Sequence, residues 1–168
     1  MNLKSQKTFL FTLFLLPHLA HAQPDRPYKE PDGLNNWFVE LGGAGLFYSI
    51  NYEKVLYRSD AWGAVGRIGL GYNPADYTLL NKIYLDKNTF MSPFTASFTF
   101  GRRKEKLETG GGFTLLSHGL LKREIAYTVI IGFRVVETNK IYFRIAYTPI
   151  FLANTYTDWY GVSLGRNF

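Results

Sequence analysis

Cysteine is absent from the 168-residue chain. Its absence excludes disulfide bonds, cysteine-ligated zinc sites and a lipid anchor attached to an N-terminal cysteine. Histidine is almost as scarce, because only His118 lies beyond residue 22. No cluster of metal-ligating residues stands out in what remains. We therefore expect neither a metal site nor a cofactor.

Long hydrophobic runs are also missing, and the longest apolar stretch lies close to the N-terminus. Lys4 and Lys7 precede the apolar segment Thr8–Leu16, and Ala20-His21-Ala22 matches the small-x-small pattern of a cleavage site. A transmembrane helix is the alternative, but this segment is well short of the roughly 20 residues needed to span a bilayer. We predict a signal peptide over residues 1–22 and export through the inner membrane.

The chain has no large excess of charge of either sign. The chain has 19 basic and 13 acidic residues, and the signal peptide contains two of the lysines and none of the acids. The small positive excess that remains is scattered along the chain. It gives no reason to expect a nucleic-acid partner.

Aromatic residues and glycine are abundant, with 14 Phe, 12 Tyr, 3 Trp and 16 Gly. Residues 23–35 are polar, contain prolines and show no periodicity, which indicates a flexible lead-in. Over residues 36–168, apolar side chains recur at every second position in segment after segment. Such alternation is typical of β-strands with two different faces. We predict an all-β, eight-stranded, antiparallel up-and-down barrel.

The number of strands depends on residues 37–56. Apolar positions are odd-numbered up to Leu41 and even-numbered from Leu46, which favours a hairpin with a two-residue turn at Gly43-Ala44. That turn would pair Leu41 with Leu46. One long strand with a glycine bulge is the alternative.

A soluble barrel also alternates, so the side that faces the lumen must be decided separately. The polar face is rich in Gly, Ala, Ser and Thr, which suit the narrow interior of an eight-stranded barrel better than a solvated surface. The apolar face is aromatic-rich on every segment. Trp37, Tyr52, Tyr72 and Tyr160 lie near strand ends, where membrane barrels carry interfacial aromatic girdles. We therefore predict that the apolar face contacts lipid.

The inward face also carries charges of both signs. Buried charges must be paired, so we predict an ionic network that closes the lumen. A narrow pore for small solutes is the alternative. The predicted members are Glu40, Glu53, Arg67, Glu108, Glu124, Arg134 and Arg144.

The predicted connections alternate between short turns and longer loops, as in barrels with short periplasmic turns. The longest connection, Asn73–Thr89, is apolar enough to contact a partner protein or lipid, although it could equally extend the strands beyond the membrane. The residues in question are Tyr77, Leu79, Leu80, Ile83, Tyr84 and Leu85.

The C-terminal segment carries a resemblance to a known family. Tyr160, Val162, Leu164 and the terminal Phe168 form an alternating apolar pattern that resembles the C-terminal recognition signal of bacterial outer-membrane barrels. Arg166 departs from that pattern. The segments Glu40–Gly45 and Ser49–Glu53 also resemble the opening of small porin-family barrels of Gram-negative bacteria. The resemblance implies an outer-membrane location and assembly by the outer-membrane barrel machinery, but no single activity.

Two features bear on enzymatic activity. Gly161–Gly165 matches the G-x-S-x-G hydrolase pattern, but no histidine or acid follows it, as that site would require. Ser117 and His118, with Glu124 nearby, could form a lipid hydrolase at the barrel rim. A polar loop tip is the simpler interpretation.

The sequence therefore predicts a non-enzymatic structural or interaction component of the cell envelope. Its expected partners are outer-membrane lipid, the barrel assembly machinery and another envelope protein bound through the outer loops.

Overall fold

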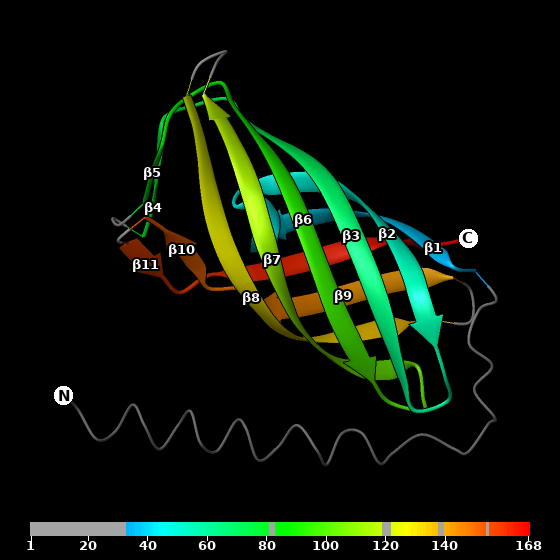
Figure 1. The fold of residues 1–168 in the computed structure, drawn as a ribbon. Coiled ribbons are helices and arrows are strands. Elements are labelled where there is room, and N and C mark those ends of the chain that lie inside the picture. The colour runs from blue at the N-terminus through cyan, green and yellow to red at the C-terminus, as the bar shows by residue number, and fades with distance from the viewer. Residues whose placement is uncertain (1–32, 81–82, 119–121, 138–139, 154) are drawn as a thin grey trace, which may run out of the picture.

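The computed structural model describes residues 33–80, 83–118, 122–137, 140–153 and 155–168. The predicted signal peptide and nearly all of the predicted lead-in lie outside these residues. Eight strands form the wall of the molecule, and Figure 1 shows how they tilt around it. Their bounds are β1 Asn35–Gly42, β2 Tyr48–Arg58, β3 Trp62–Asn73, β6 Thr89–Phe100, β7 Glu105–His118, β8 Lys122–Val136, β9 Ile141–Tyr147 and β12 Tyr160–Asn167.

The wall is a closed antiparallel barrel. Neighbours in the chain pair along the sheet from β1 to β9, β9 pairs with β12, and β1 pairs with β12 through contacts such as Val39↔Leu164. Closure removes the free edges of the sheet, so the backbone groups of the wall can be hydrogen-bonded internally. The predicted fold class, an eight-stranded up-and-down barrel, is confirmed.

One wall strand is interrupted by a proline. Strand β10 (Ile150–Leu152) pairs with β8 in the same register as β9, as Ile131↔Tyr147 and Thr128↔Ile150 show. Pro149 lies between β9 and β10, and it has no N–H to donate to the ladder. Strand β11 (Thr155–Thr157) pairs with β10 and leads into β12. The two short strands therefore extend the hairpin formed by β9 and β12.

The first two strands are separate, as the phase change predicts, but the predicted register is wrong. Leu41 pairs with Tyr48, not with Leu46. A 3₁₀ turn, η1 (Gly43–Gly45), lengthens the connection, and Leu46 is fully buried where an outward position was expected. Gly43 has a φ of 65°, and a Cβ there would lie 2.3 Å from the Glu40 carboxyl group, so only glycine fits this inward turn.

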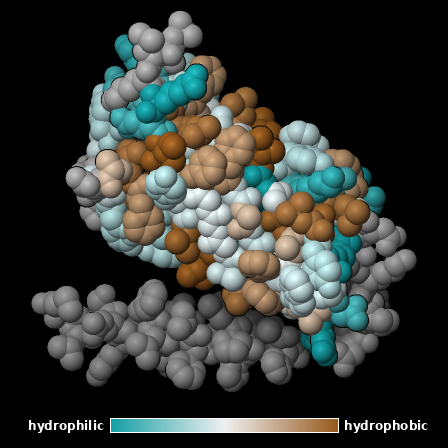
Figure 2. Space-filling model, in the orientation of Figure 1, coloured by the Kyte–Doolittle hydropathy of each residue, from teal (hydrophilic) through white to brown (hydrophobic). Residues whose placement is uncertain are grey.

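The two faces of the wall are those that the alternation predicts. Leu41 and Tyr160 are each 64% exposed on the outside, whereas Glu40 and Ser163 are completely buried on the inside. Ring pairs lie on the outer surface at both ends of the barrel. Examples are Trp37 with Tyr52, with centroids 5.1 Å apart, and Tyr147 with Tyr160 at 5.3 Å. The visible face in Figure 2 has brown apolar areas, and its larger hydrophilic patches lie toward the ends.

The barrel has two different ends. Asn35 and Phe168 exchange backbone hydrogen bonds at one of them, which we call the terminal end. The other, the loop end, holds η1, β10, β11 and a small hairpin of β4 (Tyr77–Leu79) and β5 (Ile83–Leu85). In Figure 1, β4, β5, β10 and β11 gather at the left, away from the C-terminus. Within the described residues, no helix has the length and apolar character needed to cross a membrane.

A closed sheet of this kind resists detergent until it is heated, because its backbone groups are paired internally. We expect the unboiled protein to migrate differently from the boiled protein on a denaturing gel, and to be found in the membrane fraction. Identical migration of the two samples, together with a soluble protein, would mean that the apolar face does not contact lipid.

Candidate functional site

Three arginines and three glutamates meet inside the barrel. They come from six strands: Glu40 from β1, Glu53 from β2, Arg67 from β3, Glu108 from β7, Arg134 from β8 and Arg144 from β9. Each of the six is more than nine-tenths buried. The inward positions on either side are largely small residues such as Ser97, Gly110 and Gly132, which leave room for the long arginine side chains.

Every guanidinium in this cluster contacts two carboxylates. Arg67 Nη2 lies 2.6 Å from Glu53 Oε2 and 2.9 Å from Glu108 Oε1. Arg134 approaches the same two glutamates, at 2.6 Å and 3.7 Å. Arg144 donates to Glu40 and lies 3.2 Å from Glu108 Oε1. Glu108 therefore contacts all three arginines, and the six formal charges cancel.

Two aromatic rings complete the cluster. Phe38 and Tyr142 are buried with their ring centroids 5.1 Å apart. The Arg67 guanidinium carbon lies 5.2 Å from the centre of the Phe38 ring, and that of Arg134 lies 4.8 Å from the Tyr142 ring. A ring face attracts a cation, so these contacts stabilise guanidinium groups that have lost their water.

The sequence interpretation missed both rings. Phe38 lies within the apolar run Trp37-Phe38-Val39, and Tyr142 lies between Ile141 and Phe143, so neither interrupts an apolar segment. Their position along the strand was the available signal. Phe38 is two residues from Glu40 and Tyr142 is two residues from Arg144, and residues two apart in a strand share a face.

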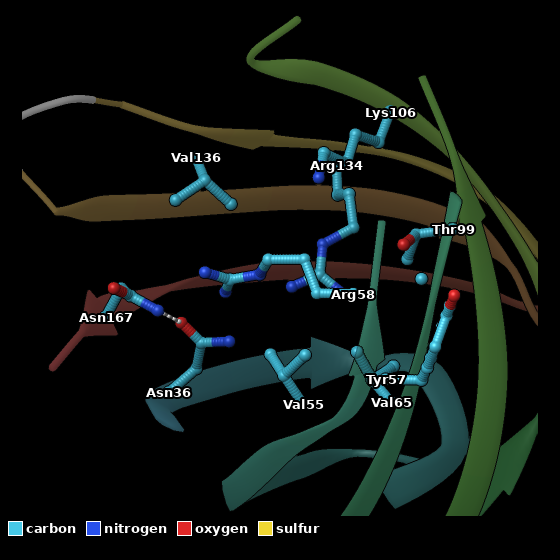
Figure 3. A pocket seen from close by; sticks show the side chains of 11 residues that line it. Asn36, Val55, Tyr57, Arg58, Val65, Thr99, Lys106, Arg134, Val136 and Asn167 are labelled. Atoms are coloured by element: carbon cyan, nitrogen blue, oxygen red, sulfur yellow. Dashed lines mark hydrogen bonds between the residues drawn. The ribbon is translucent and has the colours of Figure 1, made fainter. Parts of the chain in front are cut away.

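Polar side chains extend the cluster toward the terminal end. Asn36 Nδ2 donates to Glu53 Oε1 at 2.7 Å, and Asn167 Nδ2 donates to Asn36 Oδ1 at 3.0 Å. Figure 3 shows the pocket that these residues line, with Arg58 and Arg134 reaching into it from β2 and β8. Its volume is about 20 Å³, which is room for about one water molecule. Side chains thus fill the lumen at this end.

One predicted member of the network does not belong to the cluster. Glu124 faces Leu116 on β7, whereas Gly132, eight residues further along β8, faces Glu108. Eight strand residues span roughly 26 Å, so Glu124 lies near the opposite end of the barrel. It lines an open pocket of about 400 Å³ with Ile83, Tyr84, Ile125, Leu152, Ala153 and Thr155. Alternation placed Glu124 on the correct face of its strand. It gave no information on the position of Glu124 along the barrel axis.

Apolar side chains fill the lumen toward the loop end. The members of this apolar cluster are Leu46, Leu79, Ile83, Leu85, Met91, Leu116, Ala126 and Ile150. The inward η1 turn is held there by two hydrogen bonds: Thr114 Oγ1 donates to the Ala44 carbonyl at 2.5 Å, and Trp159 Nε1 donates to the Leu46 carbonyl at 2.8 Å.

This cluster corrects the prediction of a partner loop. Leu79, Ile83 and Leu85 are buried in it, because the β4–β5 hairpin folds over the barrel opening and packs one face inward. Tyr77, Leu80 and Tyr84 are exposed, at 40%, 58% and 57%. Only these three residues of the predicted surface are therefore available to a partner.

The hairpin is anchored at its ends by Asp76. The Lys87 backbone N–H donates to Asp76 Oδ1 at 2.9 Å, and this bond, with one from the Tyr84 hydroxyl, lowers the pKa of Asp76. The same carboxylate raises the pKa of Tyr84. Because the pKa of Asp76 is lower in the folded state, its ionised carboxylate stabilises the folded hairpin at pH values above the ordinary carboxyl pKa. This contribution is lost as the pH falls through the pKa of the folded state.

The described residues around His118 do not have the arrangement of a Ser–His–Asp hydrolase site. Thr89 Oγ1 lies 2.8 Å from His118 Nδ1, and Asp86 Oδ2 lies 3.4 Å from the same nitrogen. A catalytic histidine needs its acid on one ring nitrogen and its nucleophile on the other. Nε2 is buried and has no hydrogen-bond partner among the described residues. In the G-x-S-x-G segment, Ser163 lies on β12 and points at Glu40 and Arg144, and no strand-to-helix elbow is present there.

This architecture is that of a small, closed antiparallel β-barrel of eight strands. The structure is similar to that of the outer membrane protein Ail of Yersinia pestis in a phospholipid bilayer nanodisc, with a TM-score of 0.50 and 13% sequence identity. The match covers 82% of this chain and 100% of that one. At this identity the likeness establishes the fold alone, and membership of the porin family stays a prediction. No protein-family model matches the sequence, and no curated protein does.

The charged cluster makes a prediction about stability. Arg144→Met leaves Glu40 buried without its cation, so we expect the free energy of unfolding to fall by about 3–5 kcal/mol. Urea denaturation of the refolded protein in micelles measures this. The exposed Arg102→Met variant is the matched control and should change stability by less than about 0.5 kcal/mol. Equal effects of the two substitutions would show that the buried pair is not required for folding.

The apolar cluster makes a second prediction about stability. Leu79→Ala should lower the free energy of unfolding by about 2–5 kcal/mol, because it opens a cavity in a packed cluster. The exposed neighbour Leu80→Ala should have little effect. The same denaturation measurement compares the two variants. If both substitutions are neutral, the hairpin does not pack onto the barrel as described.

Proposed function

We propose that the chain is an integral outer-membrane barrel whose lumen is closed, and that it serves as a structural or interaction component of the cell envelope. The observation that supports this most directly is that two clusters of side chains fill the lumen over the described residues. A charge-balanced cluster occupies the middle of the barrel, and an apolar cluster occupies the loop end. Filled interiors of this kind suit a scaffold better than a channel.

The arrangement of the outer surface supports the proposed location. Exposed apolar side chains cover the wall, with aromatic pairs at both ends, as expected for a surface in contact with lipid. The fold is shared with a protein whose structure was determined in a phospholipid bilayer. With short turns at the terminal end and longer connections at the loop end, we place the terminal end toward the periplasm.

The C-terminal strand supports the proposed route of assembly. Tyr160, Val162, Leu164 and Phe168 are all exposed on the outer face of β12 and its end. We propose that the barrel assembly machinery recognises this row before the barrel closes. In the closed barrel the same row contacts lipid.

We propose the exposed side of the β4–β5 hairpin as the contact surface for an envelope partner or for lipid. Tyr77, Leu80 and Tyr84 form this side, and Tyr84 also borders the open pocket of about 400 Å³. An exposed apolar surface next to an open pocket is the type of surface that contacts other molecules.

Single-channel recording in planar bilayers tests the closed lumen. We expect no steady openings from the unaltered protein. Arg144→Ala alone should also stay closed, because the apolar cluster still fills the loop end. Combining Arg144→Ala with replacement of residues 77–85 by a glycine-serine linker should produce a leak. Steady openings of the unaltered protein would instead establish the narrow pore.

A further inference from the structure

Basic side chains lie on one side of the barrel wall at the terminal end. Lys54 on β2, Arg166 on β12 and Lys140 immediately before β9 are all exposed. Among the described residues, none of the three forms an ion pair. The other charged residues of β1, β2, β9 and β12 are Glu40, Glu53, Arg58 and Arg144, and none of them is exposed on the outer wall. On these four strands the outward charges are therefore all positive. Glu137, the acid in the turn that precedes Lys140, is paired with Lys104 Nζ at 3.1 Å.

An aromatic pair lies between these cations. Trp37 on β1 faces Tyr52 on one neighbouring strand and Arg166 on the other. Lys54 follows Tyr52 by two residues on the same face of β2 and lies opposite Asn35, which accepts a hydrogen bond from the Tyr52 hydroxyl at 2.6 Å. Two strand spacings and two residues separate the backbones of Lys54 and Arg166 by roughly 12 Å. Long flexible side chains can converge over that distance.

The depth of this arrangement points to the headgroup region. A cation on the lipid-facing surface is costly at the middle of a bilayer and costs little at the interface. Tryptophan and tyrosine also favour that interface. In a bilayer, Arg166 and Lys54 would therefore lie among the phosphate groups and not among the acyl chains.

We propose that Lys54, Arg166 and Lys140, together with Trp37 and Tyr52, bind the headgroup of an anionic phospholipid in the inner leaflet of the outer membrane. The two aromatic rings would contact the glycerol region and the start of the acyl chains. The cations would neutralise the phosphate, which in a phosphatidylglycerol has no positive group beside it. This inference rests on the proposed function, since it requires the barrel to lie in a bilayer with its terminal end toward the periplasm.

The position of Trp37 provides a direct test. Trp62→Phe and Trp159→Phe together leave Trp37 as the only tryptophan, and gel migration before and after boiling shows whether this background folds. The protein is refolded into phosphatidylcholine vesicles that contain increasing fractions of phosphatidylglycerol. Brominated acyl chains quench nearby tryptophan fluorescence. The experiment is run twice, once with brominated phosphatidylcholine and once with brominated phosphatidylglycerol. Comparing the two quenching curves gives the relative affinity of the two lipids for the site.

We expect phosphatidylglycerol to be preferred at Trp37 by about fivefold or more, since each nearby cation contributes about a fivefold preference. Lys54→Gln combined with Arg166→Gln removes two of the three cations and should reduce the preference by about fivefold or more. Arg102→Gln, which removes an exposed arginine of the same end on the turn between β6 and β7, should retain it. The second measurement is native mass spectrometry of the protein with all three tryptophans in place. It should show that the protein retains phosphatidylglycerol in preference to phosphatidylcholine.

Equal quenching by the two lipids would overturn the proposal. So would a loss of preference in Arg102→Gln as large as in the double variant, because diffuse charge would then explain the result. Inorganic phosphate that removes the preference, where chloride of equal ionic strength does not, would assign the site to a free anion. Failure of the proposed function has a different signature: no heat-modifiable band, and no quenching of Trp37 by either lipid.

Discussion

The buried arginine–glutamate cluster is the interaction on which the rest of the barrel depends. Closing eight strands creates a narrow interior that side chains must fill, and in this chain the middle of that interior is charged. A buried charge without a partner is strongly destabilising. Because Glu108 contacts arginines from three other strands, the position of each of those strands depends on the others. The cluster therefore favours one stagger of the strands around the barrel.

The change from a charged to an apolar filling along the lumen explains the shape of the loop end. Apolar side chains such as Leu46 and Met91 need cover from water at that end, and the β4–β5 hairpin supplies it with Leu79, Ile83 and Leu85. The η1 turn bends inward for the same reason. Both connections thus belong to the core of the molecule, although they lie in the parts of the sequence that read as loops.

The positions of the strands and the directions of their two faces were largely predictable. The position of each inward side chain along the barrel axis, and its contacts, were not. Alternation placed Glu40, Arg67 and Arg144 on the inside because side chains of a strand point to opposite faces with a period of two. The same rule placed Glu124 inside, but it could not show that Glu124 lies roughly 26 Å from Glu108 along the strands. The first hairpin was predicted with a register two residues wrong. The connection between β1 and β2 is longer than expected because the η1 turn bends into the lumen. Such a bend leaves no periodic pattern in the sequence.

By itself, the sequence determined the strands, the separation of an apolar face from a small and charged face, and the closure into a barrel. These properties follow from local periodicity and from the need to pair the backbone groups of a sheet whose outer face is apolar. Only the tertiary structure decided which inward residues meet, that Phe38 and Tyr142 pack among the arginines, and that Leu79, Ile83 and Leu85 of the longest loop are buried. These outcomes depend on the stagger between neighbouring strands and on how each loop packs, which are set by contacts between residues far apart in the chain.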